Sequence, residues 1–106
     1  MTDKWLIRFQ KEALPVITRE SKPEKVIIFG SRVKGNAKSG SDIDVIIVSQ
    51  YFDGVPFLRR MPIILKKVPF PKHVDYICYT PDEYSRMKNE SSVIMDALEN
   101  ALEVAV

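Results

Sequence analysis

The sequence predicts an α/β (or α+β) fold in which helices flank a small mixed sheet of three strands. Short runs rich in β-branched residues occupy residues 25–29, 43–48 and 74–79, and segments with a helical spacing of apolar residues precede and separate them. Of the 106 residues, 45% are hydrophobic and 28% are charged. This length and composition indicate one globular domain, residues 1–106.

Residues 3–19 begin with a helical pattern. Leu6, Phe9 and Ala13 recur at the spacing that places side chains on one face of a helix. Pro15 lies inside this pattern and lacks the N–H that a continuous helix requires. We therefore expect a kink or a break just before Pro15.

Further helices are expected after the strands. Thr80, followed by Pro81 and by Glu83, has the pattern of a helix start with a capping box. The expected helices cover residues 31–36, residues 56–67 with Pro62 inside, the segment from Pro81, and a last segment from Ser91 or Ser92.

The lengths of the connections predict the directions of the strands. Eleven residues, 31–41, join the first strand to the second, which is short for a parallel crossover and favours an antiparallel pair. The second connection, residues 49–73, contains a helix and is long enough for a right-handed parallel crossover. The end of the first strand then lies beside the starts of the other two.

Three aspartates stand at these strand starts. Asp42 and Asp44 are two residues apart, so both carboxylates point to one face, about 6.5–7 Å apart along the chain. A cation between them would remove their repulsion, and Mg²⁺ takes carboxylate oxygens while keeping positions for water and phosphates. Asp75 would add a third ligand and allow a second ion, about 3.5–4 Å from the first.

A Gly-Ser pair, Gly30-Ser31, ends the first strand. Gly30 would let a triphosphate approach the backbone, Ser31 offers a hydroxyl, and a helix starting at Ser31 would add N–H groups. Ordinary roles are also open, because Gly30-Ser31 can be a strand-ending turn and Asp42 can cap a turn. Neither role explains Asp44, a charge inside an apolar strand, so we favour a metal and nucleotide site.

Other polar residues receive ordinary interpretations. His73 is interpreted as a polar residue at a strand end, with contact to phosphates or to an acceptor as the alternative. The single cysteine, Cys78, lies in an apolar run and is expected to be buried rather than reactive. Four basic residues are expected to form a solvated helix face, with an acidic partner or RNA as the alternative: Arg59, Arg60, Lys66 and Lys67.

Composition excludes several classes of protein. The longest apolar runs contain four residues, so no membrane span is expected. A net charge of +2 is too small to predict nucleic-acid binding, and we expect none directly. The lone cysteine and the absence of a secretory-signal pattern in residues 1–5 predict a cytoplasmic location.

A family resemblance rests on the motifs just described. Gly30-Ser31, ten intervening residues and Asp42-x-Asp44 resemble the signature of the DNA polymerase β-like nucleotidyltransferase superfamily. Residues 30–35 are similar to the form found in minimal nucleotidyltransferases, although Val33-Lys34 stands where Ala-Arg or Ala-Lys is commoner. Residues 74–76 resemble their third-carboxylate strand, and the resemblance covers about residues 5–100.

The resemblance implies both a fold and roles for the site residues. The fold would be the polymerase β-like one, a mixed three-stranded sheet flanked by helices. Gly30 and Ser31 would hold the triphosphate of ATP, and Asp42 and Asp44 would bind the Mg²⁺ shared with it. Asp75 would complete a site for two ions and help to activate the acceptor hydroxyl.

The resemblance also implies a reaction and a partner. A hydroxyl would attack the α-phosphate of a nucleoside triphosphate and displace pyrophosphate. Minimal nucleotidyltransferases commonly work beside an all-helical HEPN ribonuclease as antitoxin and toxin, which implies a hetero-oligomer and AMP transfer from ATP to a tyrosine of the toxin. Two alternatives remain open: neutralisation of the partner by occlusion without catalysis, and transfer to a small hydroxylated molecule.

Overall fold

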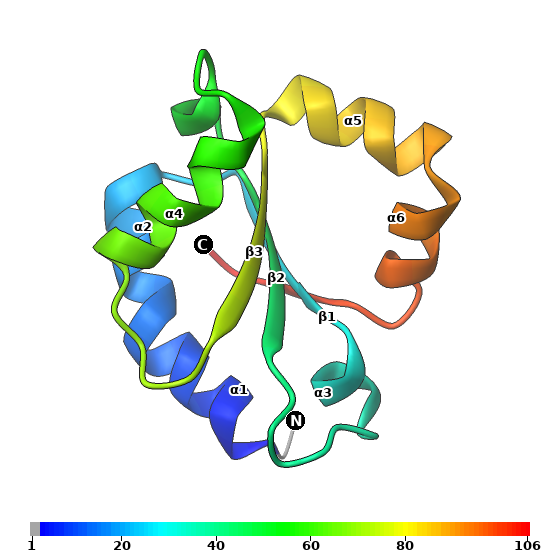
Figure 1. Ribbon diagram of the computed structural model, residues 1–106. Coiled ribbons are helices and arrows are strands. Elements are labelled where there is room, and N and C mark those ends of the chain that lie inside the picture. The colour runs from blue at the N-terminus through cyan, green and yellow to red at the C-terminus, as the bar shows by residue number, and fades with distance from the viewer. Residues whose placement is uncertain (1–2) are drawn as a thin grey trace.

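A four-stranded sheet forms the centre of the structure, with helices on both of its faces (Figure 1). The computed structural model describes residues 3–106, apart from the side chains of residues 93 and 97. The strand order is β3-β2-β1-β4. The strands are β1 (Lys25–Phe29), β2 (Ile43–Val48), β3 (Val74–Tyr79) and β4 (Leu102–Val104).

The strand directions follow the sequence prediction. β1 is antiparallel to β2, and β2 is parallel to β3. The predicted number of strands was wrong, because β4 adds an antiparallel edge next to β1. β4 has three residues, of which only Val104 is buried, and so short a segment has no alternation of its own that would identify it.

The helical elements surround the sheet. In chain order they are α1 (Lys4–Arg8), the π-helical turn η1 (Phe9–Ala13), α2 (Leu14–Ser21), α3 (Ser31–Lys34), the 3₁₀ turn η2 (Gln50–Phe52), α4 (Phe57–Lys67), α5 (Pro81–Glu90) and α6 (Ser92–Leu98). In Figure 1, α2 and α4 lie on one side of the sheet, and α5 and α6 lie on the other.

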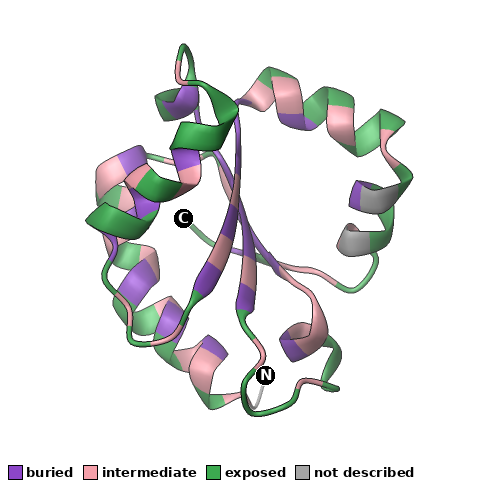
Figure 2. Cartoon of the chain, in the orientation of Figure 1, coloured by how far each residue is buried: buried purple, intermediate pink, exposed green. Residues whose placement is uncertain are grey.

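Two apolar clusters pack against the two faces. On the first face, Phe9 and Ile17 from the N-terminal helical segment and Ile64 from α4 pack on alternate residues of the strands. On the second face, Tyr84 of α5 and Ile94 of α6 cover the other set of alternate residues. Figure 2 shows the strands buried along most of their length, with exposure concentrated on the outer sides of the helices.

The predicted irregularity before Pro15 is confirmed as a π-helical turn. The Leu14 N–H donates to the carbonyl of Phe9, five residues earlier, at the end of η1. Pro15 follows and has no N–H to donate, so the wider turn accommodates the proline within a continuous helical segment. Phe9 and Ala13, inside η1, remain buried against the sheet.

Arg60 corrects the prediction of a solvated basic face. Arg59, Lys66 and Lys67 are exposed as expected, but Arg60 is only 5% exposed because it lies on the side of α4 that faces β3. Its guanidinium donates to the carbonyl of Cys78 at 3.1 Å.

The Arg60 guanidinium also forms a two-point ion pair with Glu83. The contacts are 2.5 Å to Oε1 and 3.1 Å to Oε2. The predicted capping box at Thr80 is present, and Glu83 Oε1 accepts the Thr80 N–H at 2.8 Å. The hydrogen bonds from Arg60, above all, lower the pKa of Glu83 to about 2. One carboxylate thus joins α4, β3 and the start of α5.

Cys78 is buried in β3, as predicted. It is 2% exposed, and burial raises the pKa of its thiol to about 12. A thiol held in this protonated state is a poor nucleophile. Among the described residues, moreover, every helix is too short or too polar to cross a bilayer.

The Arg60–Glu83 pair predicts a pH-dependent loss of stability in Glu83→Gln. The folded-state pKa of Glu83 lies below the ordinary value of 4.5, so its stabilisation is complete above that value and is lost as pH falls toward about 2. We expect Glu83→Gln to lower the free energy of unfolding by about 2 kcal/mol at pH 7, with a smaller difference at pH 3. Urea unfolding at both pH values measures this.

The matched control is Glu12→Gln, which removes a carboxylate from the exposed pair with Arg8. Exposed pairs contribute little, so this variant should unfold like the wild type at both pH values. A Glu83→Gln difference that does not change with pH would contradict the role assigned to the ion pair.

Candidate metal and nucleotide site

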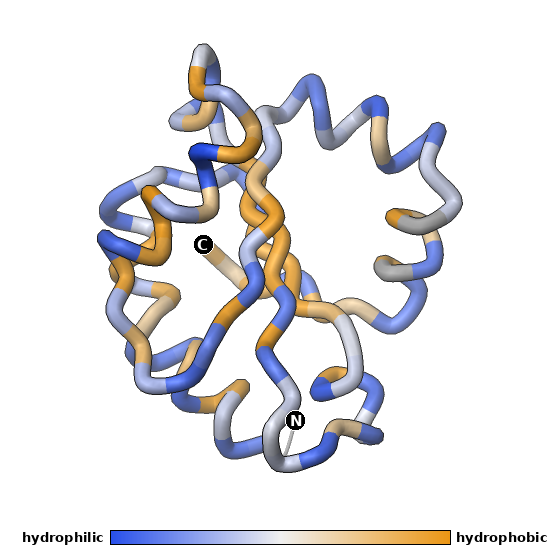
Figure 3. Tube along the Cα trace, viewed as in Figure 1, coloured by the Kyte–Doolittle hydropathy of each residue, from blue (hydrophilic) through white to orange (hydrophobic). Residues whose placement is uncertain are grey.

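The strand register brings the predicted aspartates together. Phe29 of β1 is paired with Asp44 of β2, and Asp44 is paired with Asp75 of β3. Neighbouring strands are about 4.8 Å apart, so the Asp44 and Asp75 side chains lie next to each other on one face. Asp42 precedes Asp44 by two residues at the entry to β2. Figure 3 shows hydrophilic segments near the starts of β2 and β3, within strands that are otherwise hydrophobic.

Negative charge accumulates at this end of the sheet. The pKa of Asp44 is raised, first by partial burial and then by the charges of Asp75 and Asp42. A folded protein retains such an arrangement at a cost in stability unless a cation is bound. Neighbouring carboxylates suit a divalent cation that prefers oxygen ligands, such as Mg²⁺, although Asp44 is not in the group of described residues whose ligand atoms lie within 4.8 Å of one another.

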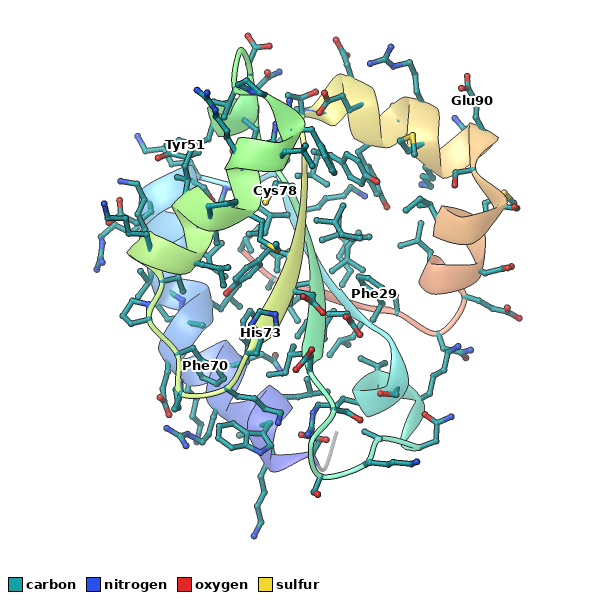
Figure 4. The ribbon with its side chains drawn as sticks, in the orientation of Figure 1. Phe29, Tyr51, Phe70, His73, Cys78 and Glu90 are labelled. Carbon is teal, nitrogen blue, oxygen red and sulfur yellow. The ribbon has the colours of Figure 1, made fainter. Side chains whose placement is uncertain are left out.

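His73 belongs to the same cluster, although from the sequence it is interpreted as an ordinary polar residue at a strand end. Its Nε2 lies 2.9 Å from Oδ1 of Asp75. One ligand atom each from Asp42, His73 and Asp75 lie within 4.8 Å of one another. His73 and Asp75 are two residues apart around the start of β3, the same spacing that identified Asp42 and Asp44, and this signal could have found His73. Figure 4 shows His73 and Phe29 toward the same end of the sheet, with Cys78 toward the other end.

Gly30 lies in direct contact with Asp44. Its backbone has φ +87° and ψ −164°, a conformation open essentially only to glycine. A Cβ at this position would collide with Oδ2 of the Asp44 carboxylate. Glycine therefore serves two needs at once: the turn out of β1 and the space for the carboxylate.

The predicted short helix after Gly30 is present but ends earlier than expected. It begins at Ser31 and ends at Lys34, because Gly35 adopts the left-handed conformation with φ +81°. Ser31 is thus the first residue of α3, adjacent to the glycine that contacts Asp44. Of the two predicted phosphate-binding residues, Gly30 lies against the Asp44 carboxylate and Ser31 follows it in the chain.

A buried arginine, Arg32, holds the loop that leads to Asp42. Its guanidinium donates to the carbonyl oxygens of Ser41 at 2.9 Å and Ser39 at 3.1 Å. It also forms a 3.0 Å ion pair with Asp3. Sequence reasoning missed this residue, because its partners are loop carbonyls that no residue pattern reveals.

Asp3 connects this loop to the first helix. Its other carboxylate oxygen caps α1 by accepting the N–H groups of Trp5 and Leu6. Partial burial raises the pKa of Asp3, but the hydrogen bonds from Leu6 and Arg32 outweigh it, so the pKa lies below the ordinary value. Through Arg32, Asp3 therefore connects the start of α1 to the loop that precedes Asp42.

Fold and site together define an α+β protein with a carboxylate cluster suited to a divalent cation, beside a Gly-Ser turn. Residues 11–104 match the family described as nucleotidyltransferase domain. The chain belongs to this nucleotidyltransferase domain family. Family membership indicates transferase activity. No curated protein matches the chain.

Solved structures share the fold. The crystal structure of a candidate nucleotidyltransferase from Sulfolobus solfataricus has a TM-score of 0.63 and 23% identity, over 92% of this chain and 77% of that one. The BolA domain of SufE1 from Arabidopsis thaliana has a TM-score of 0.54 and 17% identity, over 78% of this chain and 99% of that one. BolA1 from Arabidopsis thaliana has a TM-score of 0.52 and 19% identity, over 76% and 96%. Likeness at these identities is a likeness of fold alone.

The contact between Gly30 and Asp44 predicts that Gly30→Ala is strongly destabilising. The new methyl group would meet the carboxylate, and the backbone would be strained, at a combined cost of at least about 2 kcal/mol. Gly40→Ala is the matched control, because a Cβ there meets nothing within 4 Å and its φ is not positive. Thermal unfolding of both variants measures the difference. Equal melting temperatures would contradict this account of Gly30.

The crowding of like charges predicts that Asp44→Asn stabilises the protein in the absence of metal. Removing a partly buried charge beside two others should raise the free energy of unfolding by about 0.5–1 kcal/mol. Added divalent cation should raise the melting temperature of the wild type, because it binds only the folded state, and should raise that of the variant less. Melting with and without Mg²⁺ tests both statements. A variant less stable than the metal-free wild type would contradict them.

Proposed function

We propose that this protein is a divalent-cation-dependent nucleotidyltransferase that transfers AMP from ATP to a hydroxyl group of a protein partner. The observation that carries the proposal is the placement of Asp44 and Asp75 side by side, next to Gly30, in a chain of the nucleotidyltransferase domain family. Asp42 completes the carboxylate set, and Mg²⁺ is the cation that the sequence predicts.

The chemistry assigns a task to each residue. The backbone of Gly30 and the hydroxyl of Ser31 would hold the triphosphate, and Asp42 and Asp44 would hold the cation shared with it. The bound cation would neutralise charge on the phosphate oxygens. Asp75 would receive the proton of the acceptor hydroxyl as its oxygen bonds to the α-phosphorus, while the bond to the β-phosphate oxygen breaks and pyrophosphate leaves. Positioning and charge neutralisation would supply most of the rate.

The exposure of the site supports an acceptor that arrives from solvent. Asp42 is exposed, and the side chains of His73 and Asp75 are 53% and 49% exposed. A hydroxyl on the surface of another protein would reach these carboxylates without entering a closed pocket. We propose an all-helical HEPN ribonuclease as this partner, with a tyrosine as the acceptor, so that the chain acts as the antitoxin of a toxin–antitoxin pair.

A second candidate function is neutralisation by occlusion. A groove of about 540 Å³ is lined by Phe57, Tyr79, Met87 and polar residues of α5. Phe57, in this lining, is 49% exposed, and Leu58, the next residue in the chain, is 87% exposed. Exposed apolar residues at a groove favour a protein-binding surface, which would serve a partner whether or not AMP is transferred.

Labelled ATP distinguishes these functions. With ATP labelled at the α-phosphate, divalent cation and the helical partner, we expect label on the partner, and we expect Asp44→Asn to reduce it at least about 100-fold because ligand and charge placement are lost. Asp53→Asn, in the turn after η2, is the control and should retain full transfer.

Two results would contradict the proposal that AMP is transferred to a protein partner. One is full neutralisation of the partner by Asp44→Asn with no label on any protein, which would favour occlusion. The other is transfer to a small hydroxylated molecule in place of the partner. A wild-type rate that is independent of divalent cation would contradict the role of the carboxylates.

A further inference from the structure

We propose that His73 is a direct metal ligand, and that its imidazole nitrogen together with Asp42 and Asp75 makes a donor set that prefers Mn²⁺ to Mg²⁺. The inference rests on the proposed nucleotidyltransferase site and specifies which metal that site takes. His73 lies outside the three-aspartate set that the sequence predicted.

The distances suit one shared ion. Donor atoms about 2.1–2.2 Å from an octahedral ion are about 3 Å apart at neighbouring positions and about 4.3 Å apart at opposite ones. The separation of 2.9 Å between His73 Nε2 and Asp75 Oδ1 matches neighbouring positions. The ligand atoms of Asp42, His73 and Asp75 all lie within 4.8 Å of one another, so these side chains would have to close by about 0.5 Å at most to share one ion.

The backbone and the preceding loop hold His73 in this place. The carbonyl of His73 accepts the N–H of Ile43 at 3.3 Å, which ties the entry of β3 to the entry of β2. The neighbouring Lys72 places its ammonium 5.2 Å from the centre of the Trp5 ring and donates to the carbonyl of Ser39 at 3.4 Å. The imidazole is therefore presented on the same side as the carboxylates by a segment that is fastened at two points.

The donor chemistry selects the metal. Mg²⁺ binds oxygen ligands and gives up its water reluctantly, so a nitrogen donor contributes little to its affinity. Imidazole suits the first-row transition metals, and carboxylates suit both Mg²⁺ and Mn²⁺. Of these two cations, a set of two carboxylates and one imidazole therefore favours Mn²⁺ over Mg²⁺. Asp44, which lies against Gly30, is not among these ligand atoms.

Electron spin echo spectroscopy of the Mn²⁺-loaded protein tests the assignment directly. The chain contains one histidine, so in protein prepared without a histidine tag any imidazole nitrogen coupled to Mn²⁺ belongs to His73. We expect nitrogen modulation in the wild type that changes with ¹⁵N-histidine labelling and disappears in His73→Gln. In metal titrations, His73→Gln should lose about tenfold in Mn²⁺ affinity while Mg²⁺ affinity changes less than about threefold. Lys67→Gln, at the exposed end of α4, is the control and should keep the nitrogen coupling.

Two outcomes would overturn the inference. Mn²⁺ bound without nitrogen coupling would mean that His73 only orients Asp75, and an equal loss of Mg²⁺ and Mn²⁺ affinity in His73→Gln would mean the same. If AMP transfer persists in either case, the proposed function stands and only the assignment of His73 fails. Transfer that survives Asp44→Asn would instead refute the proposed function, whatever the spectra show.

Discussion

The hydrogen-bond register across β1, β2 and β3 is the constraint on which the site depends. It sets Phe29, Asp44 and Asp75 in one row. Ile43 and Val45, on either side of Asp44, are fully buried on the opposite face of the sheet. A slip of one residue would turn the aspartate into the core and the apolar residues toward solvent. The packing of an apolar face therefore determines where the carboxylates stand, even though no carboxylate takes part in that packing.

Local contacts further position the carboxylates that the strand register brings together. The conformation of Gly30 leaves room for the Asp44 carboxylate, and Arg32 holds the loop that delivers Asp42. Both features lower the stability of the fold. Gly30 requires a sparsely populated backbone conformation, and Arg32 is a buried charge that needs Asp3 as its partner. Proteins accept such costs mainly at functional sites. The raised pKa of Asp44 is a further cost of the same kind.

The sequence predicted the parts of this structure that depend on local patterns. The three main strands, their directions and the capping box at Thr80 follow from alternation, connection length and cap chemistry. Sequence reasoning missed β4, which has three residues and takes its identity from pairing with β1. It also misjudged Arg60 and overlooked Arg32. Both are buried, and both donate hydrogen bonds to backbone carbonyls that only tertiary folding brings near them. His73 was open to the same rule that identified Asp44, but a lone histidine near a strand end is more often an ordinary polar residue.

Strand β3 links the two surfaces that the proposed protein partner would use. Asp75, at the carboxylate cluster, and Tyr79, in the apolar groove, lie on the same face of the strand and are four residues apart. At about 3.3 Å per residue, this separates them by about 13 Å, well within the footprint of an ordinary protein interface. A partner seated in the groove would therefore bring a neighbouring hydroxyl to the carboxylates. Occlusion and AMP transfer then differ in chemistry rather than in how the two proteins dock, which is why Asp44→Asn separates them and a binding measurement does not.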